Sequence, residues 1–202
     1  GGWSPCYDES GNIDVSRCRW FSVRLTEDSA PWAFISGVPA RAISSLELLA
    51  TTLGLALLSP AGLESPGSAG TVTVTVFADS QVSSAVVRRG LTTSFPLCAV
   101  AMELSAQLEA RRAELFLEWA PRDTNKEADR LADGRFDGFS PHHRVHVDLG
   151  NVRWLVLDDL LRAGASFYRD RRKVVGSRKK ARQVAFPKGR KKRKALEERE
   201  PW

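Results

Sequence analysis

The alternation of apolar and polar residues is clearest between Thr71 and Ser80, where Val72, Val74 and Val76 are separated by threonines. A period of two in β-branched residues is typical of a strand. We expect this strand to be buried and to be followed directly by Asp79. Open α/β sheets bind ligands beyond the carboxyl ends of their strands. The stretch therefore predicts a strand that presents a carboxylate to a binding site.

The same patterns predict strands that alternate with helices along the rest of the chain. The segment 44–58 is apolar almost all round, which predicts a buried helix. Residues 27–40, punctuated by proline and glycine, are expected to be a loop. A strand–helix alternation of this kind is typical of an α/β fold. Further strands are expected at 2–3, 19–26 and 113–119, and further helices at 80–89, 96–112, 125–133 and 154–172.

Charge is distributed very unevenly along the chain. Residues 1–168 contain 15 basic and 20 acidic residues, a net charge of −5, whereas residues 169–194 contain 14 basic residues and one acid. An acidic globule with a cationic tail points to a polyanionic partner. Basic runs of this density neutralise phosphates or act as nuclear-import signals, and we expect the tail to be disordered. The two densest runs contain Arg178, Lys179 and Lys180, and then Arg190, Lys191, Lys192, Arg193 and Lys194.

Other features of the composition bear on the cellular setting. The three cysteines are scattered, which favours a reducing compartment over a disulfide framework. The sequence has neither a long apolar run nor a signal-peptide pattern, so we expect a soluble, intracellular protein of the nucleus or cytoplasm. The chain starts at Gly1 without a methionine, which suggests that its natural beginning is missing.

Three acidic residues stand out because of the elements on which they are expected. Glu47 is the only ionisable residue between Ile43 and Leu58, Asp79 follows a strand, and Asp129 lies in the first turns of a helix after another strand. Magnesium prefers a few hard oxygen ligands and leaves positions for water and phosphate. Two such ions about 4 Å apart activate water and stabilise the leaving oxygen in phosphodiester hydrolysis. The three acids are therefore candidate metal ligands.

Each acid also has a simpler explanation as a helix cap. Glu47 ends an S-x-x-E capping box, and Asp79 is a suitable N-cap residue. Thr124 and Glu127 form a second possible capping box, which would leave Asp129 as a solvated acid on a helix. An unrelated α/β domain in which the acids serve as caps is therefore one hypothesis.

The segments SLELLA around Glu47, VFADSQ around Asp79 and NKEADRLA around Asp129 resemble three acidic motifs of ribonuclease H. The similarity is closest to the ribonuclease H domain that follows reverse transcriptase in retroelement polyproteins. It implies a mixed five-stranded sheet flanked by helices, two Mg²⁺ ions held by the three acids, and cleavage of RNA in an RNA–DNA hybrid. It also implies that Asn125 shapes the loop before the last acid, and Arg122 in this loop is a candidate phosphate contact.

The resemblance also suggests a division of the chain. Residues 1–135 would form the ribonuclease H-like domain, 136–172 a C-terminal loop and helical extension, and 173–202 the basic tail. In the full polyprotein an upstream reverse transcriptase domain would be a partner.

Two departures from the family pattern change the functional expectation. The family's first catalytic Asp lies on a strand that would precede Gly1, so it is absent from this sequence. The loop 119–124 also lacks the histidine of the cellular enzymes. Removing a negative ligand weakens the capture of a cation. We therefore expect a weak or inactive nuclease, and the alternative is a non-catalytic nucleic-acid-binding module with a degenerate ribonuclease H fold.

Overall fold

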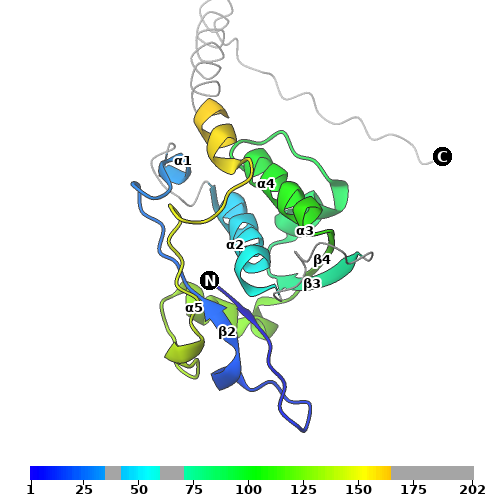
Figure 1. The fold of residues 1–202 in the computed structure, drawn as a ribbon, viewed down its shortest axis with the longest axis vertical. Helices are drawn as coiled ribbons and strands as arrows, with labels where there is room; N and C mark the ends of the chain where they lie inside the picture. The colour runs from blue at the N-terminus through cyan, green and yellow to red at the C-terminus, as the bar shows by residue number, and fades with distance from the viewer. Residues whose placement is uncertain (35–41, 60–70, 165–202) are drawn as a thin grey trace, which may run out of the picture. The chain divides into compact units, whose positions relative to one another are not determined.

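Strands and helices are intermixed along the chain in the computed structural model, which describes residues 1–34, 42–59 and 71–164 (Figure 1). This confirms the mixed α/β class. The helices predicted at 44–58, 80–89 and 96–112 and the strands at 72–78 and 113–119 are present, whereas a short helix replaces part of the loop expected at 27–40. In chain order the elements are β1 (Gly2–Ser4), η1 (Val15–Arg17), β2 (Arg19–Phe21), α1 (Pro31–Phe34), α2 (Ile43–Leu58), β3 (Val72–Ala78), α3 (Gln81–Arg89), α4 (Leu97–Ala110), β4 (Ala113–Trp119), η3 (Arg122–Thr124), α5 (Lys126–Ala132) and η4 (Pro141–His143).

The strands form two small sheets. β1 pairs with β2 in an antiparallel arrangement, and β3 pairs with β4 in parallel. Within the described ranges these are two separate two-stranded sheets, in place of the single five-stranded sheet that the resemblance implies. β2 is also shorter than the predicted strand 19–26. The chain leaves the sheet after Phe21, although Val23 and Leu25 still pack against the core.

β3 confirms the predicted strand, but the expectation that it is buried is wrong. Val74 and Val76 are half-buried, the intervening threonines are exposed, and Phe77 is 60% exposed. The helices α2, α3 and α4 contact the two-stranded sheet, and Val74 and Leu115 pack against the core. The alternation of valine and threonine therefore reflects one covered and one open face, as in a half-buried strand.

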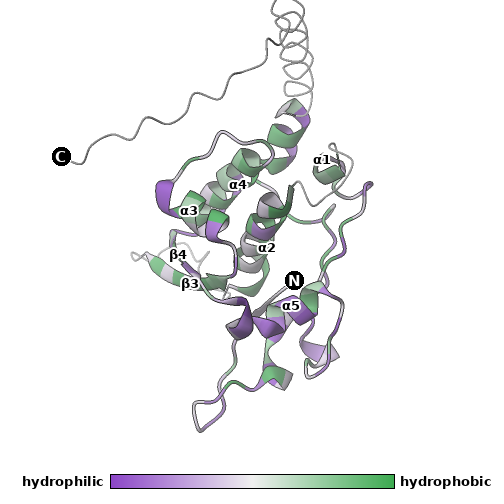
Figure 2. Ribbon diagram, turned by 180° about the vertical axis from the view of Figure 1, so that it is seen from behind, coloured by the Kyte–Doolittle hydropathy of each residue, from purple (hydrophilic) through white to green (hydrophobic). Residues whose placement is uncertain are grey.

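The main hydrophobic core lies between α2 and α4. Leu48 and Leu53 of α2 and Val100 of α4 are almost fully buried, which confirms the predicted burial of the first long helix. α4 carries apolar residues along its length, whereas α5 is mostly polar (Figure 2). A smaller cluster around Trp20 includes Leu131 of α5 and so connects α5 to β2.

The chain after β4 also joins this unit. Residues 157–164 are helical up to the last described position, so the helix predicted at 154–172 begins later than expected. Residues Gly1–Gly164 form one compact unit. The remainder of the predicted helix and the whole basic tail lie outside the described residues. In the described ranges, no helix is both long enough and apolar enough to cross a membrane.

A buried carboxylate fixes the start of the 157–164 helix. Glu103 of α4 is fully buried, and its carboxylate accepts hydrogen bonds from the backbone N–H groups of Leu155 (3.1 Å), Val156 (2.8 Å) and Leu157 (2.8 Å). Gln107 also donates its side-chain amide to Glu103, at 2.5 Å. The first N–H groups of a helix have no partner within the helix, so a carboxylate that accepts from them caps it.

Candidate functional site

Two of the three candidate acids line one open cavity of about 510 Å³. Glu47 reaches it from the first turns of α2, and Asp79 from the end of β3. Trp119 at the end of β4 and Arg122 of η3 contribute to the same wall. The cavity thus gathers two carboxylates, an arginine and an aromatic ring from four different elements. The remaining lining residues are Ile43, Ser44, Ser80, Gln81 and Val82.

The parallel pairing of β3 with β4 places the two strand ends side by side. Ala78 pairs with Trp119, and the backbone N–H of Ala120 donates to the carbonyl of Ala78 at 2.9 Å. The indole Nε1 of Trp119 donates to the carbonyl of Asp79 at 3.2 Å. The sheet therefore fixes the backbone of Asp79 at an edge where the side chains of both strand ends meet, as expected for a binding site in an α/β sheet.

The helix after β3 does not use Asp79 as its cap. Ser80 is the N-cap residue of α3, and its hydroxyl oxygen accepts a hydrogen bond from the backbone N–H of Ser83 at 3.1 Å. The capping hypothesis for Asp79 is therefore wrong. Because the neighbouring serine satisfies the helix end, the Asp79 carboxylate is left for other partners.

The other two capping explanations are also wrong. α2 begins at Ile43, with Ala42 at the N-cap position and no side-chain capping bond, so Glu47 does not complete a capping box. At α5 the N-cap residue is Asn125, again without a side-chain bond, and the hydroxyl of Thr124 donates instead to the carbonyl of Pro121 at 2.8 Å. The hypothesis that all three acids are caps thus fails at each position.

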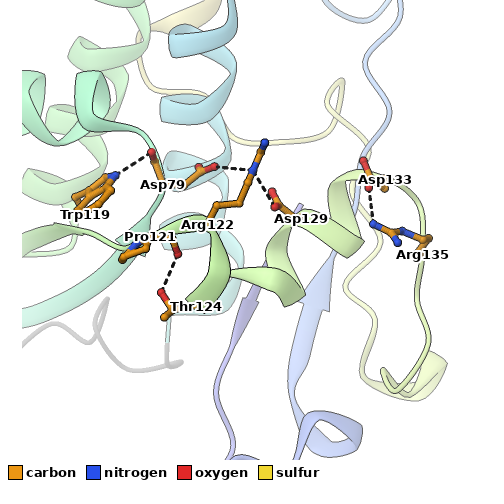
Figure 3. Close-up of polar contacts among 8 residues, drawn as sticks. All are labelled: Asp79, Trp119, Pro121, Arg122, Thr124, Asp129, Asp133 and Arg135. Carbon is orange, nitrogen blue, oxygen red and sulfur yellow. Dashed lines mark hydrogen bonds and ion pairs between the residues drawn. The ribbon is translucent and has the colours of Figure 1, made fainter.

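The third acid, Asp129, does not line the cavity but pairs with Arg122 of its wall. The Nε of Arg122 lies 3.0 Å from Oδ2 of Asp129 and 3.7 Å from Oδ2 of Asp79 (Figure 3). The short turn η3 makes this possible, because the N–H of Asn125 donates to the carbonyl of Arg122 and the N–H of Asp129 donates to that of Asn125. Asn125 thus acts through its backbone in the loop that it was expected to shape. One nitrogen thus contacts two carboxylates that come from different elements.

The arrangement fits a metal ion only in part. Among the described residues, no three acidic, histidine or cysteine side chains come together as a set that could hold a metal. Asp79 and Asp129 share one positive charge, and Glu47 lines the same cavity as Asp79. A pair of carboxylates suits one divalent cation that keeps several waters, as Mg²⁺ does. The two-ion arrangement needs further ligands.

No family model, curated protein or solved structure matches the chain.

Sequence reasoning missed Trp119 as part of the site. Its side chain is 49% exposed on the cavity wall, next to the backbone of Asp79. Trp119 could have been identified from its position at the end of a second predicted strand, because neighbouring parallel strands end at the same edge of a sheet. An exposed aromatic ring beside carboxylates is a suitable stacking surface for a nucleobase.

The candidate contacts of the tail cannot be placed in the site. The residues concerned are Arg178, Lys179, Lys180, Arg190, Lys191, Lys192, Arg193 and Lys194, and all of them lie outside the described residues.

Proposed function

We propose that the cavity is the active site of a ribonuclease H-type domain from a retroelement reverse transcriptase. The reaction is the metal-dependent hydrolysis of RNA in RNA–DNA hybrids, with weak activity for this chain. The observation that carries the proposal is that Arg122 contacts Asp79 and Asp129 at once, while Glu47 lines the same cavity. Glu47 and Asp79 line the cavity, Asp129 pairs with an arginine of its wall, and none of the three acids is used as a helix cap.

In this proposal the acids hold the divalent cation and the other cavity residues hold the substrate. Asp79 and Asp129 would bind Mg²⁺, with Glu47 contributing from α2. The ion supplies Lewis-acid stabilisation of the phosphate and a more acidic bound water. Arg122 donates to a phosphate oxygen of the substrate, for which its planar fork of N–H groups is well suited. Trp119 offers its exposed ring to a base, and the basic tail adds contacts that do not depend on sequence.

A second candidate function is a nucleic-acid-binding module without catalysis. It is favoured by the same ion pairs, because an arginine already neutralises the two aspartates, and by the lack of a three-residue ligand set in the described part of the chain. Such a module would bind hybrid through the tail and the cavity and would respond little to magnesium.

Cleavage of a labelled RNA–DNA hybrid in the presence and absence of Mg²⁺ tests the first candidate. We expect slow, magnesium-dependent cleavage by the wild-type chain and none above background by Asp79→Asn or Asp129→Asn, since each variant removes a charge that holds the cation. Asp137→Asn is the matched control, because Asp137 is an 83% exposed acid that pairs with Arg130 away from the cavity. It should cleave like the wild type.

Robust cleavage by both wild type and Asp79→Asn would refute the assignment of Asp79. A magnesium titration of the melting temperature separates the two candidates, because a ligand that binds the native state stabilises it. A rise that disappears in Asp79→Asn supports the metal-dependent enzyme. Tight hybrid binding with no magnesium response supports the non-catalytic module.

A further inference from the structure

Two of the three cysteines contact one another in the β1–β2 hairpin. The chain between the two strands is closed by an antiparallel bridge between Tyr7 and Ile13. Cys6 comes directly before this bridge, and Cys18 directly before β2. The backbone N–H of Cys6 donates to Sγ of Cys18 at 3.2 Å, although the two residues are 12 positions apart. The cysteines that look scattered in the sequence therefore include one pair in contact.

The backbone around the pair holds the two thiols close together. The N–H of Asp14 donates to the carbonyl of Cys6 at 2.8 Å, and the thiol of Cys18 donates to the carbonyl of Asp14 at 3.2 Å. Burial is the main cause that raises the pKa of the Cys18 thiol; the hydrogen bond from Cys6 lowers this pKa, and the Cys6 thiol raises it. An electrostatic effect between two thiols weakens with distance, which agrees with neighbouring sulfur atoms. Rotation about χ1 of Cys6 then sets how near its sulfur comes to that of Cys18.

The two thiols differ in their access to water. Cys18 is fully buried in the smaller core with Trp20, whereas Cys6 is half-buried and packs against the same cluster. Oxidation of a cysteine follows the exposure and the thiolate fraction of its sulfur. A small oxidant dissolved in water therefore meets Cys6 first, and Cys18 is the protected neighbour that reacts second.

We propose that Cys6 and Cys18 are a thiol–disulfide modification site, which hydrogen peroxide converts into an intramolecular disulfide. The thiolate of Cys6 attacks one peroxide oxygen and the O–O bond breaks. The sulfur becomes a sulfenic acid, and the departing hydroxide takes up the proton that Cys6 released. The sulfur of Cys18 then attacks the Cys6 sulfur, the S–O bond breaks, and the proton of Cys18 leaves with the oxygen as water. The two thiols are oxidised by two electrons, and the peroxide is reduced to two molecules of water.

The disulfide joins the hairpin to the core on which α5 rests. The cluster that contains Cys18 also contains Leu131 of α5, and the hydroxyl of Ser22 donates to the carbonyl of Leu131 at 2.7 Å. A cross-link restricts the unfolded chain and so stabilises the folded state. Oxidation therefore stabilises the smaller core and, with it, the helix that carries Asp129. This inference does not depend on nuclease activity.

A purely structural role for Cys18 predicts a different outcome. If its sulfur only fills the core and accepts a hydrogen bond, peroxide should oxidise the thiols according to their exposure alone. Cys98 of α4 is half-buried, as Cys6 is, and would then react alongside it. Pairing instead predicts that Cys6 and Cys18 lose their thiols together while the thiol of Cys98 is retained.

The test treats the folded chain with a stoichiometric amount of hydrogen peroxide, then unfolds it and counts the free thiols by alkylation with a maleimide. We expect one alkylated cysteine in place of three, and a peptide map in which Cys6 is linked to Cys18. Dithiothreitol should restore all three thiols. Cys98→Ser is the matched control and should form the same link, whereas Cys6→Ser should form none.

Thermal unfolding measures the effect of the disulfide on stability. We expect the Tm of the oxidised wild type to exceed that of the reduced protein by about 5–10 °C, and dithiothreitol should reverse the rise. Cys98→Ser should show the same rise, and Cys6→Ser should show none. Amide hydrogen exchange should also become slower across α5 in the oxidised protein, since this helix rests on the linked core.

The wild-type chain gives the deciding results, so they do not depend on whether a variant folds. Three free thiols after oxidation, or a link that includes Cys98, overturn the proposal. A disulfide between two chains, seen as a dimer on a non-reducing gel, overturns it as well. The expected link without a rise in Tm overturns the stabilising role, and unchanged exchange in α5 overturns its extension to this helix. Each of these failures leaves the proposed nuclease function untouched, because the measurements use neither metal nor nucleic acid.

Discussion

At the scale of single residues, the acid with the deepest burial lies outside the proposed active site. Glu103 is fully enclosed and meets the backbone N–H groups of Leu155, Val156 and Leu157, more than 50 positions away in the chain. Sequence reasoning singled out Glu47 as the unusual charge in an apolar helix, yet Glu47 is only half-buried. Local patterns identify a charge among apolar neighbours, but they contain no information about a partner that is distant in sequence.

Glu103→Ala should strongly destabilise the protein. The substitution leaves three backbone donors and an amide without their charged acceptor, and we expect a loss of about 3 kcal/mol in the free energy of unfolding, measured in urea. Glu109→Ala is the control on the same helix, because Glu109 is exposed, and its effect should stay within about 0.5 kcal/mol. Equal effects of the two substitutions would show that the cap has no energetic role.

The resemblance predicted that Glu47, Asp79 and Asp129 together hold metal ions, but the described residues do not bring the three together as a set of metal ligands. Glu47, Asp79 and Asp129 were identified because each sits at a characteristic place on a predicted element. The ion pairs of Arg122 depend on the side-chain directions of a three-residue turn, and sequence patterns do not specify these directions. Arg122 was accordingly expected to meet phosphate, whereas in the structure it contacts two carboxylates.

At the scale of elements, the periodic pattern identified side chains that face the core. It did not identify where the strands pair. The long helices and the paired strands β3 and β4 were found where periodicity placed them. The alternation at 19–26 continues through Val23 and Leu25, which do pack on the core, but the strand itself ends at Phe21. Alternation reports which side chains face the core. Backbone pairing also requires a neighbouring strand, and that information is not local.

Two glycines provide matched tests of helix geometry. Gly54 lies inside α2 with open space where a Cβ would be, so Gly54→Ala should stabilise the protein by about 0.5–1 kcal/mol. Gly90 ends α3 in the left-handed region, with φ of 68°, so Gly90→Ala should cost about 1 kcal/mol. Thermal and urea unfolding of both variants measure these changes, and shifts of the same sign would contradict the assigned helix boundaries.

At the scale of the whole molecule, acidic and basic residues are concentrated in different parts of the sequence. The acidic balance of residues 1–168 opposes contact with a polyanion, whereas residues 169–194 favour it. A neutralised phosphate changes the slope of log affinity against log salt by about 0.7–0.9. The tail should therefore supply most of the sequence-independent affinity for nucleic acid. The cavity should determine whether the bound strand is cleaved.

Deletion of residues 178–202 should lower hybrid affinity and flatten its salt dependence by several slope units. Replacement of Arg190 and Arg193 by lysine keeps the charge and should leave the slope unchanged. Anisotropy titrations at four or more salt concentrations measure both variants. A truncated chain with an unaltered slope would exclude the tail as the source of phosphate contacts.

The position of Trp119 makes its fluorescence sensitive to the contents of the cavity. Its indole is half exposed and bonded to the backbone of Asp79, while Trp20 is enclosed in the smaller core. Indole emission depends on the polarity and charge of its immediate surroundings. A ligand that enters the cavity should therefore change the emission of this ring, which is one of six tryptophans in the sequence, and the change can be assigned to it if Trp119→Phe abolishes it.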